Sequence, residues 1–136
     1  MATLPIATRN ELVDYFAAKW DVGSGAATIQ VRNGVKPAAT SDAATGTLLA
    51  TFTLSDPGWA AASGGVANLD ITPAITTTGV AAGTATWARV LAPDSSVVVD
   101  LTAGIGGSGA DLIFDNPVIA IGQTVNLTVG TITQPA

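Results

Sequence analysis

Apolar and polar residues alternate over much of this chain, which is the pattern of strands that bury one face. Residues 47–54 place Leu48, Ala50, Phe52 and Leu54 on one side and mostly threonines on the other. Residues 27–32 and 124–132 alternate in the same way, and stretches rich in glycine and proline separate such segments. This pattern predicts an all-β fold of about seven or eight short strands. We expect a two-sheet antiparallel sandwich of jelly-roll or Greek-key type.

The helical period replaces this alternation only near the N-terminus, where residues 8–19 predict one short helix. Thr8 and Glu11 match the spacing of a capping box, in which each side chain bonds a free backbone N–H. An apolar stripe follows at helical spacing and consists of Leu12, Val13, Phe16, Ala17 and Trp20. The stripe packs on the domain's own sheet or docks on a neighbouring subunit. We expect residues 1–7 to form an arm and residues 8–136 to form a single domain.

A predicted hairpin lies at the centre of the chain, with strands at residues 85–91 and 97–101. Pro93 has the backbone angle that the second position of a type I turn requires. A turn at residues 92–95 places Val90 opposite Val97 and Ala88 opposite Val99. Small and apolar side chains therefore share one face of this hairpin.

The other face of the hairpin carries Trp87, Arg89, Leu91 and Asp100, a mixture typical of neither a core nor an open surface. Such a face is expected to be covered. One explanation is an interface with a partner, because Trp and Arg are frequent at binding hot spots. The other is an ion pair between Arg89 and Asp100 underneath the predicted helix.

Composition narrows the functional classes. Of the 136 residues only 11% are charged, the net charge is −5, and the chain contains neither His nor Cys. The few cations are scattered and form no patch, which argues against a nucleic-acid partner. No apolar run reaches the ~18–20 residues that a membrane-spanning helix needs, so we expect no membrane partner.

Candidate chemistry is equally sparse, and we expect a protein that is not an enzyme and uses no cofactor or metal. Without His the usual catalytic triads lack their base, and zinc lacks its common ligands. Asp111 and Asp115, with Asp100 near them, are the best carboxylate cluster for a calcium ion, but loop-end aspartates more often cap backbone N–H groups. Residues 104–109 are rich in glycine and are expected to form a turn between strands, because no lysine or helix follows as in a phosphate-binding loop.

Several segments resemble small structural proteins of tailed bacteriophages. They are TGTLLATFTLSDP at 45–57, ASGGV at 62–66, GTATWARV at 83–90, SGADL at 108–112 and GQTV at 122–125, with RN at 9–10 and GSGA at 23–26. The alanine-rich residues 38–44 and the three valines at 97–99 depart from that pattern. The resemblance implies a β-sandwich that is present in many copies on a virus shell.

The function that this resemblance implies is a capsid decoration, or cement, protein that binds the outside of the capsid lattice and stabilises it. Its partners would be the major capsid protein and further copies of itself, as a dimer or trimer. It would be made in the bacterial cytoplasm and reside on the virion. Candidate interface residues are Trp87, Arg89, Leu91 and Asp100, with Leu4 and Ile6 in an arm that reaches another subunit. The alternatives are a receptor- or carbohydrate-binding module of a tail or head fibre, and a tail-tube or connector ring component.

Overall fold

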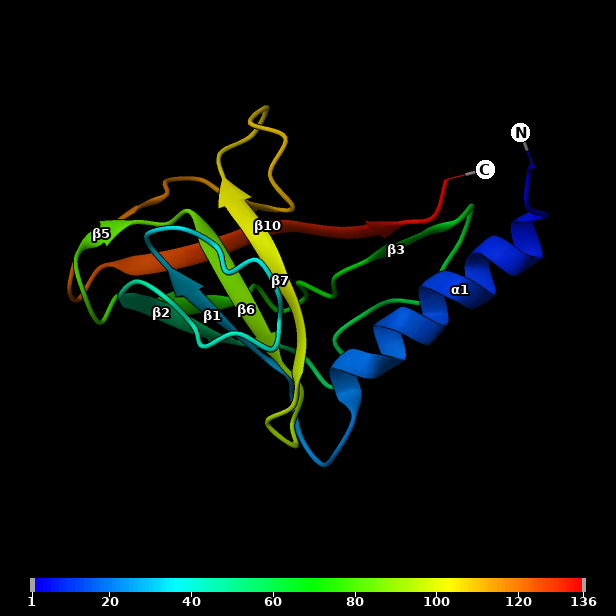
Figure 1. Cartoon of the computed structure of the whole chain (residues 1–136), viewed down its shortest axis with the longest axis horizontal. Coiled ribbons are helices and arrows are strands. Elements are labelled where there is room, and N and C mark those ends of the chain that lie inside the picture. Colours follow the sequence, from blue (N-terminus) through cyan, green and yellow to red (C-terminus); the bar gives the residue numbers. More distant parts are fainter. Residues whose placement is uncertain (1, 136) are drawn as a thin grey trace.

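One helix and ten strands succeed one another along the part of the chain, residues 2–135, that the computed structural model describes (Figure 1). Helix α1 covers Ile6–Ala18 and continues into the single 3-10 turn η1, Lys19–Asp21. The strands are β1 Thr28–Arg32, β2 Leu48–Thr53, β3 Val66–Asn68, β4 Thr76–Thr78, β5 Gly83–Thr84, β6 Trp87–Leu91, β7 Val97–Gly104, β8 Leu112–Phe114, β9 Val118–Ile119 and β10 Thr124–Thr133. The predicted β-rich fold with one N-terminal helix is confirmed.

Eight of the strands form one sheet in the order β2-β1-β6-β7-β8-β10-β3, with β4 also paired to β10. The sheet curves so that β2, at one end of this order, approaches the segment that follows β4. There the N–H of Val80 donates to the carbonyl of Leu49 in β2 at 2.8 Å. The pairs are antiparallel except β7 with β8, which run parallel. The result is a mixed, nearly closed barrel-like sheet and not clearly the antiparallel two-sheet sandwich that the alternation predicted. Strands β5 and β9 form a separate small sheet.

The interior of the barrel is filled by the inward faces of the predicted strands. Ile29 and Val31 in β1 and Phe52 in β2 have no exposed surface, as their alternation predicts. The rings of Phe52 and Phe114 stack across the interior with centroids 5.8 Å apart. Alternation therefore identified much of the core, but it placed Leu49 on the outer face of β2, where this residue is in fact fully buried.

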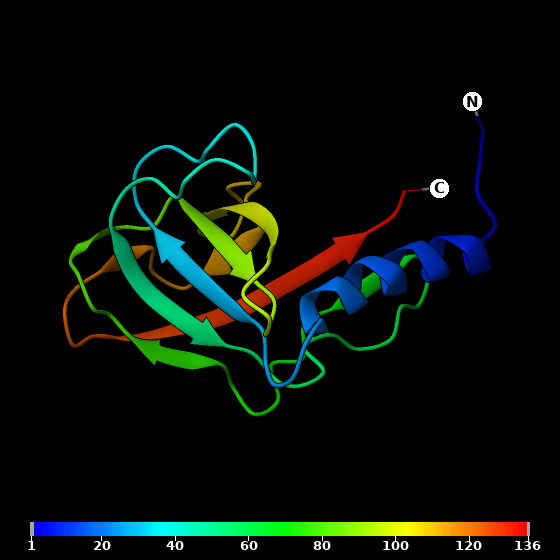
Figure 2. The ribbon, with the colours of Figure 1, turned by 60° about the horizontal axis from the view of Figure 1, so that its bottom comes forward.

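Helix α1 lies outside the barrel, alongside the end of β10 and strand β3 (Figure 2). The helix buries Val13 and Ala17 and the following turn η1 buries Trp20, whereas Leu12 of the predicted stripe is 46% exposed. The helix begins at Ile6 with Pro5 as its N-cap, so the capping box predicted at Thr8 was wrong. The reason is that Pro5, at φ −56°, already has the angle of a first helical turn, and its carbonyl accepts the N–H of Arg9. The predicted arm is accordingly shorter, since residues 6 and 7 belong to the helix.

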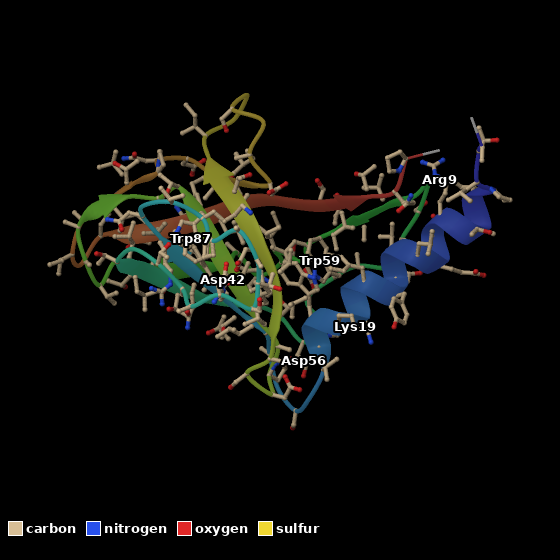
Figure 3. All side chains as sticks on the ribbon, viewed as in Figure 1. Arg9, Lys19, Asp42, Asp56, Trp59 and Trp87 are labelled. Carbon is tan, nitrogen blue, oxygen red and sulfur yellow. The ribbon has the colours of Figure 1, made fainter. Side chains whose placement is uncertain are left out.

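Polar side chains of α1 attach it to the rest of the domain. Arg9 donates through Nε to the carbonyl of Gln134 at 2.9 Å, and Asn10 accepts the N–H of Gly65 at 2.8 Å. Asp14 accepts the N–H of Ala62 at 2.8 Å. Figure 3 shows Arg9 at the end of the helix that lies beside the C-terminal tail. The helix therefore packs on its own domain, which was one of the two predicted alternatives.

The central hairpin forms as predicted, but its register differs by two residues. Ser95 donates to the carbonyl of Ala92, which confirms the turn at 92–95. Ser95 then adopts φ +69° and a bulge follows, so Val90 pairs with Val99 rather than Val97. A shift of two preserves the side-chain faces, because side chains alternate with period two. Arg89 and Asp100 consequently lie directly opposite each other.

Candidate functional site

The charged pair at the centre of the hairpin is the best-defined polar cluster of the protein. Strands β6 and β7 place Arg89 opposite Asp100, and the guanidinium donates through Nε and Nη2 to the two carboxylate oxygens at 2.8 Å each. The side chains are only 7% and 3% exposed. The hydrogen bonds to Asp100 hold the pKa of Arg89 above its ordinary value, while burial opposes this shift. The two side chains therefore form a buried, bidentate ion pair.

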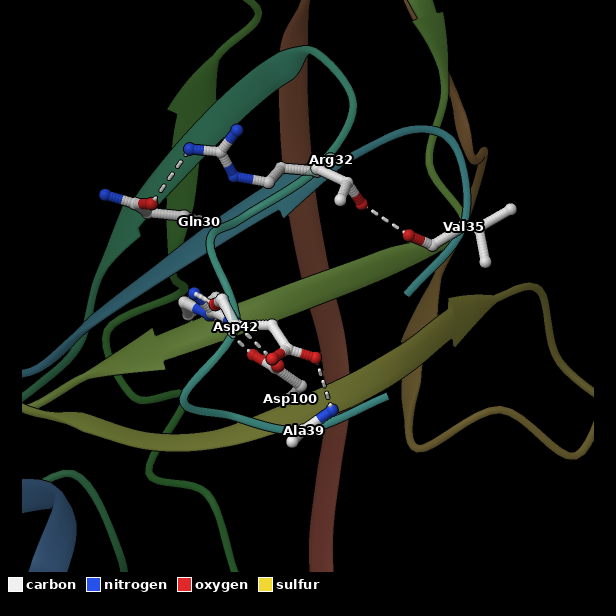
Figure 4. Close-up of polar contacts among 8 residues, drawn as sticks. Gln30, Arg32, Val35, Ala39, Asp42 and Asp100 are labelled. Atoms are coloured by element: carbon white, nitrogen blue, oxygen red, sulfur yellow. Dashed lines mark hydrogen bonds and ion pairs between the residues drawn. The ribbon is translucent and has the colours of Figure 1, made fainter. Parts of the chain in front are cut away.

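The chain covers this pair with its own loop, residues 33–47, which joins β1 to β2. The third contact of Arg89 runs from Nη1 to the carbonyl of Asp42 at 2.9 Å. Trp87 donates from Nε1 to the carbonyl of Asn33 at 3.1 Å at the start of the same loop. In Figure 4 the loop segment with Ala39 and Asp42 crosses directly over Asp100. The loop, and not the helix, is therefore what lies over the predicted face.

The six predicted interface residues fall into two groups. Trp87, Arg89 and Asp100 are enclosed by the loop. Contacts within one chain, the ion pair of Arg89 with Asp100 and the burial of the Trp87 ring, therefore explain why this face is covered. Leu91, at the end of β6, is half-buried. Leu4 and Ile6 are 38% and 49% exposed and lie at the N-terminal end of α1. Only the last two present substantial apolar surface to a partner, and the structure does not bring them close to the other four.

Two of the three aspartates considered for a calcium ion, Asp100 and Asp111, have protein partners instead. Asp100 is bound by Arg89, and Asp111 accepts the N–H and the hydroxyl of Thr102 at 2.8 Å each. Asp111 thus bonds backbone at a loop end, which was the simpler of the two predictions for it. Within residues 2–135 no group of three or more metal-ligating side chains comes together. The glycine-rich segment at 104–109 joins the parallel strands β7 and β8, as a connection between strands.

A groove between α1 and β7 was missed by sequence reasoning. One part of it is lined by Phe16, Lys19 and Val22 on the helix side and by residues 96–98 on the strand side. The adjoining part is an apolar cavity of about 160 Å³ that lies between the helix and the ends of β7, β8 and β10. Figure 3 shows Trp59 in this space, between α1 and β7. The only sign of this groove in the sequence was the row of three valines at 97–99. A strand with one buried face requires an apolar residue only at every second position, so the middle of the row exceeds what the alternation needs.

Two tryptophans form the inner wall of this cavity. Trp20 is 1% exposed and Trp59 is 8% exposed, and their rings meet edge to face with centroids 4.9 Å apart. Neither indole Nε1 has a hydrogen-bond partner. A buried donor without a partner is costly, and most buried donors in proteins are satisfied. The groove therefore has an apolar, aromatic wall, and the two unpaired indole nitrogens are buried within it.

A second apolar surface lies at the opposite end of the barrel, near β5 (Figure 1). Val80, Val118 and Ile121 are 60%, 54% and 74% exposed. Their segments are joined by hydrogen bonds, since Gly122 donates to the carbonyl of Gly79 and β9 pairs with β5. We call these three residues the barrel-end patch. Exposed apolar side chains gathered on adjoining segments are typical of a contact surface.

Comparison of the chain with models of known protein families, with curated proteins and with solved structures found no match. Among the described residues no helix is long and apolar enough to cross a membrane.

Proposed function

We propose that this protein is a non-enzymatic capsid decoration protein of a tailed bacteriophage, which binds the outside of the shell and stabilises it. The observation that carries the proposal is the barrel-end patch, where three apolar side chains in β9 and its two neighbouring loops are exposed to solvent. The resemblance of residues 45–57 and 83–90 to phage structural proteins indicates a virus shell as the surface to which the patch binds. On this proposal the protein acts on the virion, with the major capsid protein as its partner.

The distribution of polar groups supports a role in binding rather than in catalysis. The ion pair of Arg89 with Asp100 and the contacts that hold α1 in place use these side chains to join elements of the domain. A cement protein needs a rigid body and an apolar footprint, and it needs no reactive group. The low charge of the chain suits surfaces that become buried against neighbours.

We also propose that the nearly closed sheet functions as a two-layered sandwich of the type expected for such proteins. The sheet is weakest between β7 and β8, where only two residue pairs connect its halves. The stacked rings of Phe52 in β2 and Phe114 in β8 join the two halves through the interior.

The test is binding to capsids that lack the protein, followed by cryo-electron microscopy of the decorated shells. We expect many copies at repeated lattice positions with the barrel-end patch against the capsid. Ile121→Asp should lower occupancy because it places a charge in the apolar contact, whereas Ile105→Asp, at an exposed site in the glycine-rich loop, should not. Equal occupancy for both variants would refute the role of the patch. A few copies confined to the tail or one vertex would refute decoration.

A ring component of the tail tube or connector is the second candidate, and the groove beside β7 favours it. A groove on one surface that receives a segment from a different surface gives a head-to-tail contact, and such contacts close into rings when the rotation allows. Cryo-electron microscopy of virions distinguishes the two candidates, because a ring component would lie in the tail or at the connector, whereas a decoration protein would cover the shell.

A further inference from the structure

The groove beside α1 follows an unpaired strand edge. Strand β7 pairs with β6 along nearly its whole length, but it pairs with β8 only at Ala103 and Gly104. Beyond these, Thr102 gives its N–H to the side chain of Asp111. Residues 97–101 therefore have a strand neighbour on one side only. An open edge of this kind is a template for another extended segment.

The neighbouring strand on the far side of the gap is open as well. The pairing of β8 with β10 ends where Leu112 meets Gly130, and β10 continues to Thr133. Over residues 131–133 it pairs with β3, which the strand order places on the side away from β8. Strand β8 is thus three residues long between neighbours of eight and ten residues. Its line continues into the space between the diverging ends of β7 and β10, which we call the slot (Figure 1).

The bottom of this slot is the cavity of about 160 Å³, lined by apolar side chains of both strands and by aromatic rings. An apolar cavity of roughly 150 Å³ accommodates a benzene-sized group. The slot therefore suits an extended chain that brings an apolar side chain for the cavity and a backbone that pairs with the open edge of β7.

We propose that the slot binds the N-terminal arm, residues 2–5, of a second copy of this chain, with Leu4 in the cavity. The arm is extended, ends in Pro5 at ψ 149°, and leaves Leu4 38% exposed. The other terminal segment is already tied down, because Gln134 donates to the carbonyl of Gly65 and accepts from Arg9. Among the described residues the arm is the terminal segment that is free to pair.

The arm cannot fill the slot of its own chain. Leu4 is two residues from the start of α1, so it reaches at most about 7 Å from Ile6. Phe16, at the near wall of the cavity, is ten residues along the helix, a rise of about 15 Å. The polar contacts of Arg9 and Asp14 hold the helix in its place. Only the arm of another molecule can therefore enter.

The sequence of the arm fits such a strand. Side chains alternate, so Ala2 and Leu4 face one side and Thr3 faces the other. Pro5 has no N–H to pair and lies at the strand's end, where a missing donor does least harm. Burying the exposed surface of one leucine is worth about ten- to a hundredfold in affinity. The contact forms between copies in solution and does not depend on the capsid role.

Cysteine cross-linking tests the arrangement directly, because the natural chain has no cysteine to compete. One tagged preparation carries Leu4→Cys and a second, untagged preparation carries Val99→Cys, which lines the cavity. After mixing and mild oxidation we expect a disulfide-linked species that contains one chain of each kind. The control replaces Leu4→Cys with Val35→Cys. Val35 is 83% exposed and lies in the loop at residues 33–47 that joins β1 to β2. Equal cross-linking of the control pair would overturn the proposal.

Light scattering during size-exclusion chromatography supplies the second test. We expect the wild type to associate with rising concentration, and Leu4→Asp to weaken this association by about ten- to a hundredfold. Val35→Asp should associate like the wild type. Because Leu4 is exposed in the single molecule, circular dichroism should show the variant folded. A wild type that stays monomeric at every concentration, or a Leu4→Asp variant that associates normally, would refute the arm exchange while leaving capsid binding to be measured separately.

Discussion

Replacing Arg89 by leucine should destabilise the protein strongly, because it leaves the buried carboxylate of Asp100 without a partner. The guanidinium supplies both hydrogen bonds of Asp100, whose side chain is 3% exposed. Breaking one partner of a buried ion pair typically costs about 3–5 kcal/mol. A domain of this size is stable by about 5–15 kcal/mol, so the variant should fold but with much of its stability lost.

Removing both charges should cost far less than removing one. In the double variant Arg89→Leu with Asp100→Leu, no charge remains buried, and hydrophobic replacement of a buried pair is often close to neutral. One loss persists, since Arg89 also bonds the carbonyl of Asp42 in the covering loop. We therefore expect the double variant to be slightly less stable than the wild type, with faster hydrogen exchange in residues 38–45.

The assay is equilibrium unfolding in urea, followed by tryptophan fluorescence, for the wild type, both single variants and the double variant. The four free energies of unfolding form a cycle that isolates the coupling between the two side chains. We expect a coupling of several kcal/mol, as for a desolvated pair. A coupling below about 1 kcal/mol is the value of exposed pairs and would refute the reasoning that the loop excludes water from this contact.

Three further predictions concern a glycine, a carboxylate and the arm. Gly46 adopts φ +71° where a Cβ would overlap the carbonyl of Asn33, so Gly46→Ala should cost about 1–3 kcal/mol in urea unfolding, whereas Gly106→Ala, which meets no atom, should cost little. Burial raises the pKa of Asp21, so the folded state holds its proton more tightly and the stability that Asp21 contributes falls as pH rises through that raised value. Thermal unfolding of Asp21→Asn should therefore improve relative to the wild type from about pH 3 to about pH 7, and a pH-independent difference would contradict this. Deleting residues 2–4, which keeps Pro5 and its bond to Arg9, should leave the unfolding midpoint unchanged, because these residues are exposed, and a lowered midpoint would show that they pack on their own chain.

The sequence by itself determined the strands, the helix and most of the core. Alternation placed Ile29, Val31 and Phe52 inside, because a strand with one covered face needs period two whatever its neighbours are. The pairing of Arg89 with Asp100 was also predictable, since a register shift of two returns the same residues to the same face. Local patterns carry this information because each strand must bury its own apolar side.

Only the tertiary structure decided which strands are neighbours, and with them the surfaces that matter. The parallel contact of β7 with β8 and the near closure of β2 with the segment after β4 join residues far apart in sequence. No local pattern encodes such pairs, because the energy of pairing depends on both strands at once. The loop at 33–47 reads as an ordinary connection until its carbonyl at Asp42 is seen to cap Arg89. The groove beside β7 likewise exists only because β8 is shorter than the strands on either side of it, a difference that no single segment of sequence contains.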